Sequence, residues 1–204
     1  KIAYRGMGTL GEDHHVAPSH PEYFPLPKRE RDVAAAKKLL ADAGFPNGLD
    51  IDLIVGNTQG RYEQDCAQIL QQNCLEAGIR LNLKVIPAAQ YWPIWDKAAF
   101  SLTYWAHRPL GVMSLELAYR GGGAWNESHY SDPAFDAALD RAMGIIDPKQ
   151  RAVAMQSVEQ ILQDACVIVQ PFWGDKFTAV SKKVQGFEVH PSDFYPMGNV
   201  WLSA

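Results

Sequence analysis

The stretch RDVAAAKKLLADAGFPNGLDIDLIV, residues 31–55, decides the fold class of this chain. In its first half, apolar side chains recur at the spacing of a helix, so we expect a helix over residues 29–43. Gly44 favours a left-handed stop and Pro46 follows two residues later, which is typical of a helix C-terminus. The apolar residues Ile51, Leu53 and Val55 then alternate, which predicts a strand.

The same order of elements repeats downstream. The sequence predicts a helix over about 61–77 that stops at Gly78, an alternating strand over 79–85, a short helix near 88–97 and a strand over 100–105. Two further helices should begin at Asp132-Pro133 and Asp147-Pro148, because Asp caps helices well and Pro suits the first turn. The second of these helices is expected to run to about residue 163. The alternation of strands and helices predicts an α/β layered domain.

The last expected strands are apolar. Residues 167–172 read as a continuous apolar strand, paired with residues 177–180 through a turn at Gly174-Asp175. Cys166 precedes this run and is expected to be buried. Cys66 and Cys74 lie eight residues apart on one expected helix, or about 12 Å, which is too far for a disulfide. The sequence therefore contains no disulfide framework.

The composition of the chain argues against a membrane-spanning protein and against a nucleic-acid-binding protein. The chain has 204 residues, 47% of them hydrophobic, and a formal net charge of −4. It contains no apolar run of about 18 residues, so no membrane span is expected. Basic residues cluster only at positions 28–31, which argues against nucleic acid as a partner. The first residue is Lys1, and the start reads like the interior of a longer polypeptide.

Catalytic and metal-binding patterns are missing from the sequence. Ser128 and His129 are adjacent, which does not place a nucleophile against its base. No nucleophile elbow, zinc-protease helix or phosphate-binding loop occurs, and Gly121–Gly123 is not followed by a Lys. His14 and His15 lie with Asp13 and His20 in a segment whose spacing matches no structural zinc pattern. We therefore expect neither an enzyme, nor a cofactor, nor a metal.

The candidate ligand-binding residues gather between residues 105 and 136, apart from His14 in the N-terminal segment. They are Trp105, His107, Arg108, Trp125, Asn126 and His14. Large aromatic faces with an Arg, a His and an Asn suit the gripping of a small molecule. If residues 105–108 were a strand, His107 and Arg108 would face opposite sides, so at most one of them would reach a cleft directly.

Each of these residues also has a structural explanation. Trp105 and Trp125 are either walls of a cleft or part of the core. Arg108 either contacts a ligand, pairs with an acid elsewhere or stacks on Trp105. For Asn126 we favour a role in fixing its loop through backbone hydrogen bonds.

Four motifs, in order, resemble the family 5 extracellular solute-binding proteins, the dipeptide, oligopeptide and nickel receptors of ABC importers. The first is AKKLLADAGFPNG at residues 36–48. The second combines Trp125-Asn126, Tyr130 and DPAFD at 132–136. The third is the helix with Arg151, Gln156, Ile161 and Leu162, followed by residues 167–171. The last is VQGF at 184–187, so the resemblance covers nearly the whole chain.

The resemblance implies a fold and a set of partners. It implies the C-terminal lobe of a type II periplasmic-binding-protein fold, with a mixed sheet flanked by helices. Residues 1–28 would be a linker near the hinge, 29–181 the ligand-binding lobe and 182–204 a tail near the hinge. The partners would be a small-molecule or peptide ligand, an N-terminal lobe of the same polypeptide and an ABC permease at the membrane. The protein would be a periplasmic or extracytoplasmic monomer, and His14 would touch the hinge or the cleft edge.

One departure from the family bears on the ligand. In the peptide-binding members, the stretch after the tryptophan that matches Trp105 carries an acidic residue that pairs with the peptide ammonium. Here His107 and Arg108 occupy that stretch, and no acid follows until Glu116. A cation there would repel an ammonium and favour a carboxylate or phosphate. An alternative class is a transcription regulator with the same fold that senses a ligand. An export signal upstream of this chain would indicate the receptor, whereas DNA-binding helices there would indicate the regulator.

Overall fold

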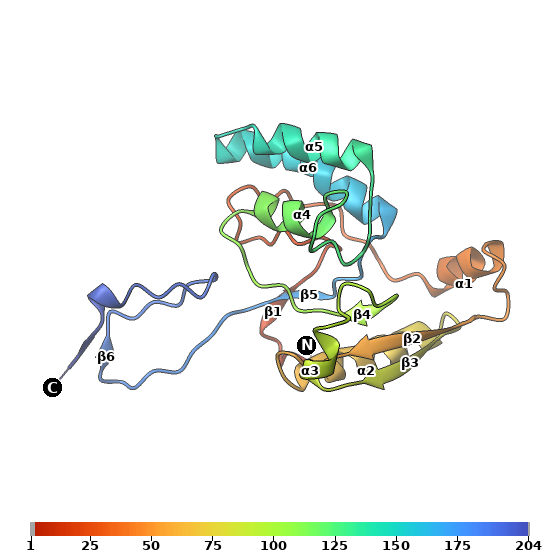
Figure 1. The fold of residues 1–204 in the computed structure, drawn as a ribbon, viewed down its shortest axis with the longest axis horizontal. Coiled ribbons are helices and arrows are strands. Elements are labelled where there is room, and N and C mark those ends of the chain that lie inside the picture. The colour runs from red at the N-terminus through yellow and green to blue at the C-terminus, as the bar shows by residue number, and fades with distance from the viewer. Residues whose placement is uncertain (1–2, 204) are drawn as a thin grey trace. The chain divides into compact units, whose positions relative to one another are not determined.

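The computed structural model describes residues 3–203 and divides into two compact units. Unit 1 comprises residues 1–6 and 27–104, and unit 2 comprises residues 7–26 and 105–204. Figure 1 shows the helices and strands of both. Each unit is described by itself below.

Unit 1 is built on a parallel three-stranded sheet. β2 (Leu49–Val55) lies between β3 (Ile79–Val85) and β4 (Ser101–Leu102). β2 and β3 pair over their full length, from Leu49 opposite Ile79 to Val55 opposite Val85. α2 (Tyr62–Leu75) connects these two strands and packs against both. The buried core consists of Leu53, Val55, Ala67 and Leu81. The predicted helix and strand order is confirmed here.

Local signals set the ends of the helices in this unit. α1 (Val33–Asp42) begins after Asp32, whose side chain accepts from the N–H of Ala35 at 2.8 Å. Gly44 follows it with φ +92°, as expected of a left-handed stop. α3 (Ala88–Tyr91) is shorter than the predicted 88–97, because Pro93 lacks the N–H that would continue the helical hydrogen bonds. The strand predicted over 100–105 is also too long, since only Ser101 and Leu102 pair with β2.

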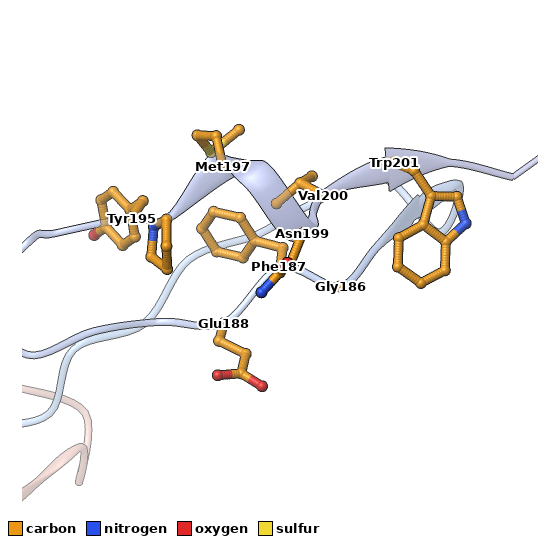
Figure 2. Close-up of a pocket in the computed structure, with 9 residues that line it drawn as sticks. Gly186, Phe187, Glu188, Tyr195, Met197, Asn199, Val200 and Trp201 are labelled. Atoms are coloured by element: carbon orange, nitrogen blue, oxygen red, sulfur yellow. The ribbon is translucent and has the colours of Figure 1, made fainter.

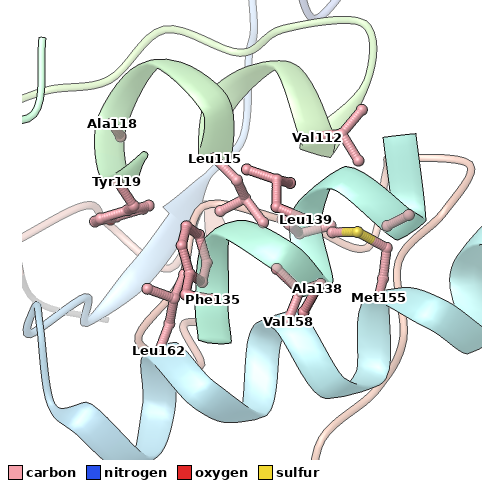
Figure 3. Packing of buried hydrophobic residues seen from close by; sticks show 12 residues of the cluster. Val112, Leu115, Ala118, Tyr119, Phe135, Ala138, Leu139, Met155, Val158 and Leu162 are labelled. Atoms are coloured by element: carbon pink, nitrogen blue, oxygen red, sulfur yellow. The ribbon is translucent and has the colours of Figure 1, made fainter. Parts of the chain in front are cut away.

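Unit 2 has a helical core. It contains α4 (Gly111–Tyr119), α5 (Pro133–Met143) and α6 (Pro148–Ala165). Their apolar faces meet around Leu115, Phe135, Leu139, Met155 and Leu162, all of which are fully buried (Figure 3). α4 was not predicted, because six of its nine residues are buried and apolar positions nearly surround it, leaving no clear periodic stripe.

The two Asp-Pro starts are confirmed as helix caps. The side chain of Asp132 accepts from the N–H of Ala134, and that of Asp147 accepts from the N–H of Gln150, both at 2.8 Å. α6 ends at Ala165, and its C-cap Cys166 has left-handed backbone with φ 51°. Cys166 is exposed, so its predicted burial is wrong. As the C-cap of α6, Cys166 lies outside the helical core, and its Sγ lies 3.6 Å from the carbonyl oxygen of Gln163.

The C-terminal strand pairing also differs from the prediction. β5 (Phe172–Gly174) pairs antiparallel with β1 (Gly8–Leu10), and not with residues 177–180. Glycine permits this close approach, because a Cβ at Gly11 would lie 2.1 Å from the carbonyl oxygen of Gln170. The partner strand therefore comes from the N-terminal segment, which the sequence reading treated as a linker without strands.

The C-terminal segment forms a hairpin of its own. β6 (Val184–Gln185) pairs with β7 (Trp201–Leu202), and a short 3-10 helix, η1 (Met197–Asn199), precedes β7. Gly186 has φ +72°, and a Cβ there would lie 2.0 Å from the carbonyl oxygen of Asn199. Only glycine fits this position, which explains the glycine of the VQGF motif. Among the described helices, none is long and apolar enough to cross a bilayer.

The fold class is the predicted one, α/β with helices flanking the sheets. Parallel and antiparallel pairings both occur, in separate sheets. The predicted division into hinge-proximal ends and a central lobe stays a prediction, and residues 1, 2 and 204 of those ends lie outside the described part of the chain.

Candidate functional site

All six candidate residues belong to unit 2, where two tryptophans form the centre of the site. The Nε1–H of Trp105 donates to Oε1 of Glu127 at 2.6 Å. The rings of Trp105 and Trp125 meet edge to face, with their centroids 6.2 Å apart. Trp105 is half-buried against the helical core, whereas Trp125 is 47% exposed. Trp105 is thus held by Glu127 and the helical core, and about half of the Trp125 side chain is open to solvent.

An imidazole continues the aromatic row behind Trp105. The ring of His15 lies 5.2 Å from that of Trp105 and 5.3 Å from that of Tyr119. The hydroxyl of Tyr119 lies 3.2 Å from Nδ1 of His15, which fits a neutral ring that accepts this bond. Burial, together with the nearby His14 and His20, lowers the pKa of His15 to about 3. The row Tyr119–His15–Trp105–Trp125 is therefore uncharged at neutral pH.

Arg108 supplies a cation at the exposed end of this row. Its guanidinium carbon lies 5.7 Å from the ring centroid of Trp125, within the range of a cation–π contact. Its Nε is buried and has no hydrogen-bond acceptor among the described residues. A buried donor without an acceptor is costly, and the described residues supply none to this atom.

His107 stacks on His20 beside Arg108. The two rings are nearly parallel, with 16° between their planes and 4.4 Å between their centroids. Residues 105–108 form no strand, so the predicted alternation of His107 and Arg108 does not apply. Burial lowers the pKa of His107 to about 4, and His20, His190 and Lys176 contribute in the same direction. His107 is thus neutral and packed at neutral pH.

Asn126 fixes the loop that carries Trp125. Its amide donates to the carbonyl oxygens of Arg120 at 3.1 Å and Tyr130 at 2.7 Å, and its Oδ1 accepts from Ser128 at 2.8 Å. It is buried. These bonds use the side chain fully, as expected for a loop-fixing residue.

His14 lies in the interior of unit 2. It is fully buried, with Nε2 3.4 Å from a Glu12 oxygen and 3.9 Å from a Glu159 oxygen. Its Nδ1 accepts from the N–H of Val16 at 3.2 Å. Burial lowers the pKa of His14 to about 4 and raises that of Glu159 to about 9. The predicted ligand contact of His14 stays a prediction, and its burial does not support it.

Sequence reasoning missed three residues of the site: His15, His20 and Glu127. Glu127 is 22 positions from Trp105 in sequence, and no pattern linked the two. Its place directly after Trp125-Asn126 was the available signal. His15 and His20 were considered only as metal ligands. Among residues 3–203, no group of three or more His, Cys, Asp or Glu residues has the geometry to hold a metal ion.

A separate pocket lies in the C-terminal hairpin. Phe187, Tyr195, Met197 and Trp201 are among its lining residues (Figure 2). The rings of Phe187 and Tyr195 stack with centroids 5.4 Å apart. None of the six candidate residues lines this pocket, so the tryptophan pair and not the hairpin pocket is the candidate site.

Comparison with known proteins identifies the family of this chain. Residues 1–120 match the family model for bacterial extracellular solute-binding proteins, family 5 Middle. The chain belongs to this family. The matched segment ends at Arg120 and includes Trp105, His107 and Arg108.

Individual relatives of this family 5 chain are distant. Heme-binding protein A of Haemophilus influenzae is 23% identical over 204 residues, which cover 94% of this chain and 36% of the relative. The glutathione-binding protein GsiB of Pectobacterium atrosepticum is 25% identical, covering 96% of this chain and 40% of the relative. The solved structure of HbpA2 from Haemophilus parasuis matches with a TM-score of 0.78 and 26% identity, over 98% of this chain and 41% of that one.

The chain therefore spans about two-fifths of the length of its relatives. The predicted family and the predicted fold, that of a type II periplasmic binding protein, are confirmed. The relatives named above are binding proteins, which favours the receptor hypothesis over the transcription regulator.

Proposed function

We propose that this chain is the C-terminal lobe of a receptor that captures a small solute outside the cytoplasm and delivers it to an ABC permease. Its membership in the solute-binding family supports this role. The site is a surface of aromatic faces with one cation, which binds a molecule without supplying a nucleophile or an acid–base pair. A role as an enzyme is accordingly not proposed.

The observation that carries the proposal is the setting of Arg108. Its guanidinium lies over the half-exposed ring of Trp125, and its buried Nε lacks an acceptor among the described residues. A carboxylate or phosphate would pair with this guanidinium through charge-assisted hydrogen bonds. We infer a ligand that presents an anionic group to Arg108. Heme and glutathione, named for two relatives, both carry carboxylates.

The other candidate residues surround Arg108 and differ in how directly each would contact the ligand. Trp125 offers its free face to an apolar part of the ligand, and Trp105 forms the wall behind it. His107 lies at the edge of the site on His20. Asn126 holds the loop of Trp125 in place, and His14 stays a candidate only at the hinge.

The hairpin supports the presence of a second lobe. Phe194, Met197, Trp201 and Leu202 are each at least 60% exposed. Exposed apolar surface of this extent is typical of an interface. We infer that residues 182–204 pack near the hinge against the remainder of a longer polypeptide, together with residues 1–28. The ligand would then be enclosed between two lobes, in a monomeric receptor.

The test is native mass spectrometry of the full-length parent protein, purified so that a cellular ligand stays bound. The expected result is a co-purified solute that carries a carboxylate or phosphate. Arg108→Ala should lower its affinity about tenfold to a hundredfold, because a charge-assisted hydrogen bond contributes about 1.5–3 kcal/mol. Arg108→Lys serves as the matched control, since it keeps the charge but loses the planar fork.

Two outcomes would contradict parts of this proposal. A bound solute with a free ammonium and no anionic group would keep the receptor role but rule out the anion contact of Arg108. Failure to retain any solute, including after incubation with heme and with glutathione, would contradict the receptor role itself.

A further inference from the structure

The position of Arg108 depends on its backbone, and one buried side chain holds that backbone. Nε2 of His20 lies 3.0 Å from the carbonyl oxygen of Arg108, across 88 residues of sequence. His20 is 5% exposed. It comes from the N-terminal segment of unit 2, within residues 1–28, which the sequence predicts to be a linker.

The hydrogen bonds of His20 define its tautomer. Nε2 faces the carbonyl oxygen of Arg108, which can only accept, so in the neutral ring Nδ1 carries no proton; Nδ1 accepts from the N–H of Ala17 at 2.8 Å and also lies 3.2 Å from the carbonyl oxygen of Ala17. The proton therefore sits on Nε2, which donates to the carbonyl oxygen of Arg108. The N–H of His20 also donates to the carbonyl oxygen of Ala17 at 2.9 Å, which closes the turn over residues 17–20. The ring is thus fixed from both sides.

Contacts on the neighbouring residue strengthen this link. His107, directly before Arg108, stacks on the His20 ring with centroids 4.4 Å apart. His20 therefore contacts two successive residues of the 105–109 segment, one through its ring face and one through its Nε2–H. Burial lowers the pKa of His20, which keeps the ring neutral and Nδ1 able to accept.

We propose that His20 is a positioning residue that holds Arg108 so that its guanidinium lies over Trp125. The Nε of Arg108 is buried and has no acceptor among the described residues, so it makes no hydrogen bond there that would fix the side chain. The Nε2–H of His20 is therefore the contact that restrains the start of this side chain. The importance of this contact for ligand binding rests on the proposed function, whereas the contact itself does not.

Two substitutions separate the bonds of the ring. His20→Gln places an amide N–H where Nε2 lies, so it can still donate to the carbonyl of Arg108. His20→Asn places an oxygen near Nδ1, so it can still accept from Ala17 but does not reach Arg108. Ser19→Ala, at an exposed neighbour in the same turn, is the control.

The measurement is quenching of Trp125 fluorescence in the 204-residue chain by iodide and by acrylamide. Each variant is compared with the same variant carrying Trp125→Phe, which isolates the signal of Trp125 among six tryptophans. A guanidinium about 6 Å away should raise the local iodide concentration roughly twofold to threefold, with no effect on neutral acrylamide. Arg108→Ala provides the quenching of Trp125 in the absence of the guanidinium.

We compare the ratio of the iodide quenching constant of Trp125 to its acrylamide quenching constant. In His20→Asn this ratio should fall to the value found for Arg108→Ala. In His20→Gln and in Ser19→Ala it should stay at the value of the unsubstituted chain. A ratio unchanged in His20→Asn, or lowered equally in both His20 variants, would overturn the positioning role while the anion attraction of Arg108 still stood. A ratio unchanged in Arg108→Ala would contradict both.

A second measurement keeps the proposal testable if His20→Asn does not fold. Nitrogen-15 correlation spectra of the unsubstituted chain report which ring nitrogen of each histidine carries the proton. The proposal requires an unprotonated Nδ1 and a protonated Nε2 on His20 at neutral pH. The opposite tautomer would overturn it.

Discussion

Unit 1 and unit 2 differ in where they keep their titratable groups. Unit 1 contains no histidine, and its ion pairs lie on its surface, including Arg80–Asp50 and Arg31–Glu76. Its buried carboxylate, Glu63, is well satisfied: it accepts from the N–H of Thr58 at 2.7 Å, the Thr58 hydroxyl at 2.9 Å and the N–H of Gln59 at 3.1 Å. The buried carboxyl group of unit 1 therefore receives its hydrogen bonds from residues close to it in sequence.

Unit 2 instead encloses titratable groups in its interior. It holds all six histidines, and both His14 and Glu159 are fully buried. Their pKa values are displaced far from the ordinary ones, downward for His14 and upward for Glu159. The unit that carries the candidate site is thus the one whose stability depends on protonation. This difference between the units can be tested directly.

The largest expected effect is a selective loss of unit 2 in acid. The folded-state pKa values of His14 and His107, each about 4, and of His15, about 3, lie below the ordinary 6.5. Their contribution is therefore fully present above pH 6.5 and is lost as the pH falls toward 4. Each such group lowers the free energy of unfolding by up to about 1.4 kcal/mol per pH unit.

Glu159 acts in the opposite direction. Its folded-state pKa of about 9 lies above the ordinary 4.5, so its contribution is full below pH 4.5 and is lost as the pH rises toward 9. Between pH 6.5 and 4.5 three histidines outweigh this one carboxyl. Unit 2 should therefore be most stable near pH 6.5. Hydrogen exchange followed by mass spectrometry, from pH 4 to 9, can follow α5 and α6 against β2 and β3; parallel loss of protection in both sets would contradict the comparison.

The second prediction tests whether the units are energetically separate. Phe135 is fully buried, with its ring 6.4 Å from that of Tyr119 and 5.7 Å from that of Tyr130. Phe135→Ala should lower the free energy of unfolding of unit 2 by about 3–5 kcal/mol through lost burial and a cavity. Urea unfolding with hydrogen exchange measures this loss. Phe177→Ala, at a position that is 65% exposed, is the control and should change little. Equal weakening of β2 and β3 would show one cooperative unit instead of two.

The same contrast explains what the sequence could predict. In unit 1 the elements follow from local patterns, such as the alternation over 79–85 and the stop at Gly78, because residues close in sequence are enough to set both signals. The Asp-Pro caps of unit 2 are equally local. The bonds of the site are not: His20 reaches Arg108 across 88 residues, and β1 pairs with β5 across more than 160. No periodicity encodes such contacts, so the site residues were predicted by type and the contacts that hold them were missed.

A third prediction concerns the buried carboxylate of unit 1. Glu63→Ala leaves the N–H groups of Thr58 and Gln59 without their acceptor, and each such loss costs about 1–3 kcal/mol. Thr58 is only partly buried and Gln59 is exposed, so water can replace the lost acceptor and we expect the low end of this range, a total of about 2–3 kcal/mol in unit 1. Glu63→Gln keeps one acceptor oxygen and should lose less than half as much. Denaturant unfolding of both variants measures the difference. Equal losses would show that the charge of Glu63, and not its acceptor geometry, stabilises the turn.

The smallest expected effect lies on the surface of unit 1, at the Arg80–Asp50 pair. The guanidinium donates to both carboxylate oxygens, at 2.8 and 2.7 Å, yet both side chains are exposed. Exposed pairs contribute little because water and salt screen them. Arg80→Ala should therefore change the urea midpoint less than any variant above.

The pair still lowers the pKa of Asp50 through the hydrogen bonds from Arg80, so in Arg80→Ala that pKa should return toward 3.8. Carbon-13 NMR titration of Asp50 measures this return. A large loss of stability with no change in pKa would mean that Arg80 acts instead through its bond to the carbonyl oxygen of Asn47, which ties the α1–β2 turn to β3.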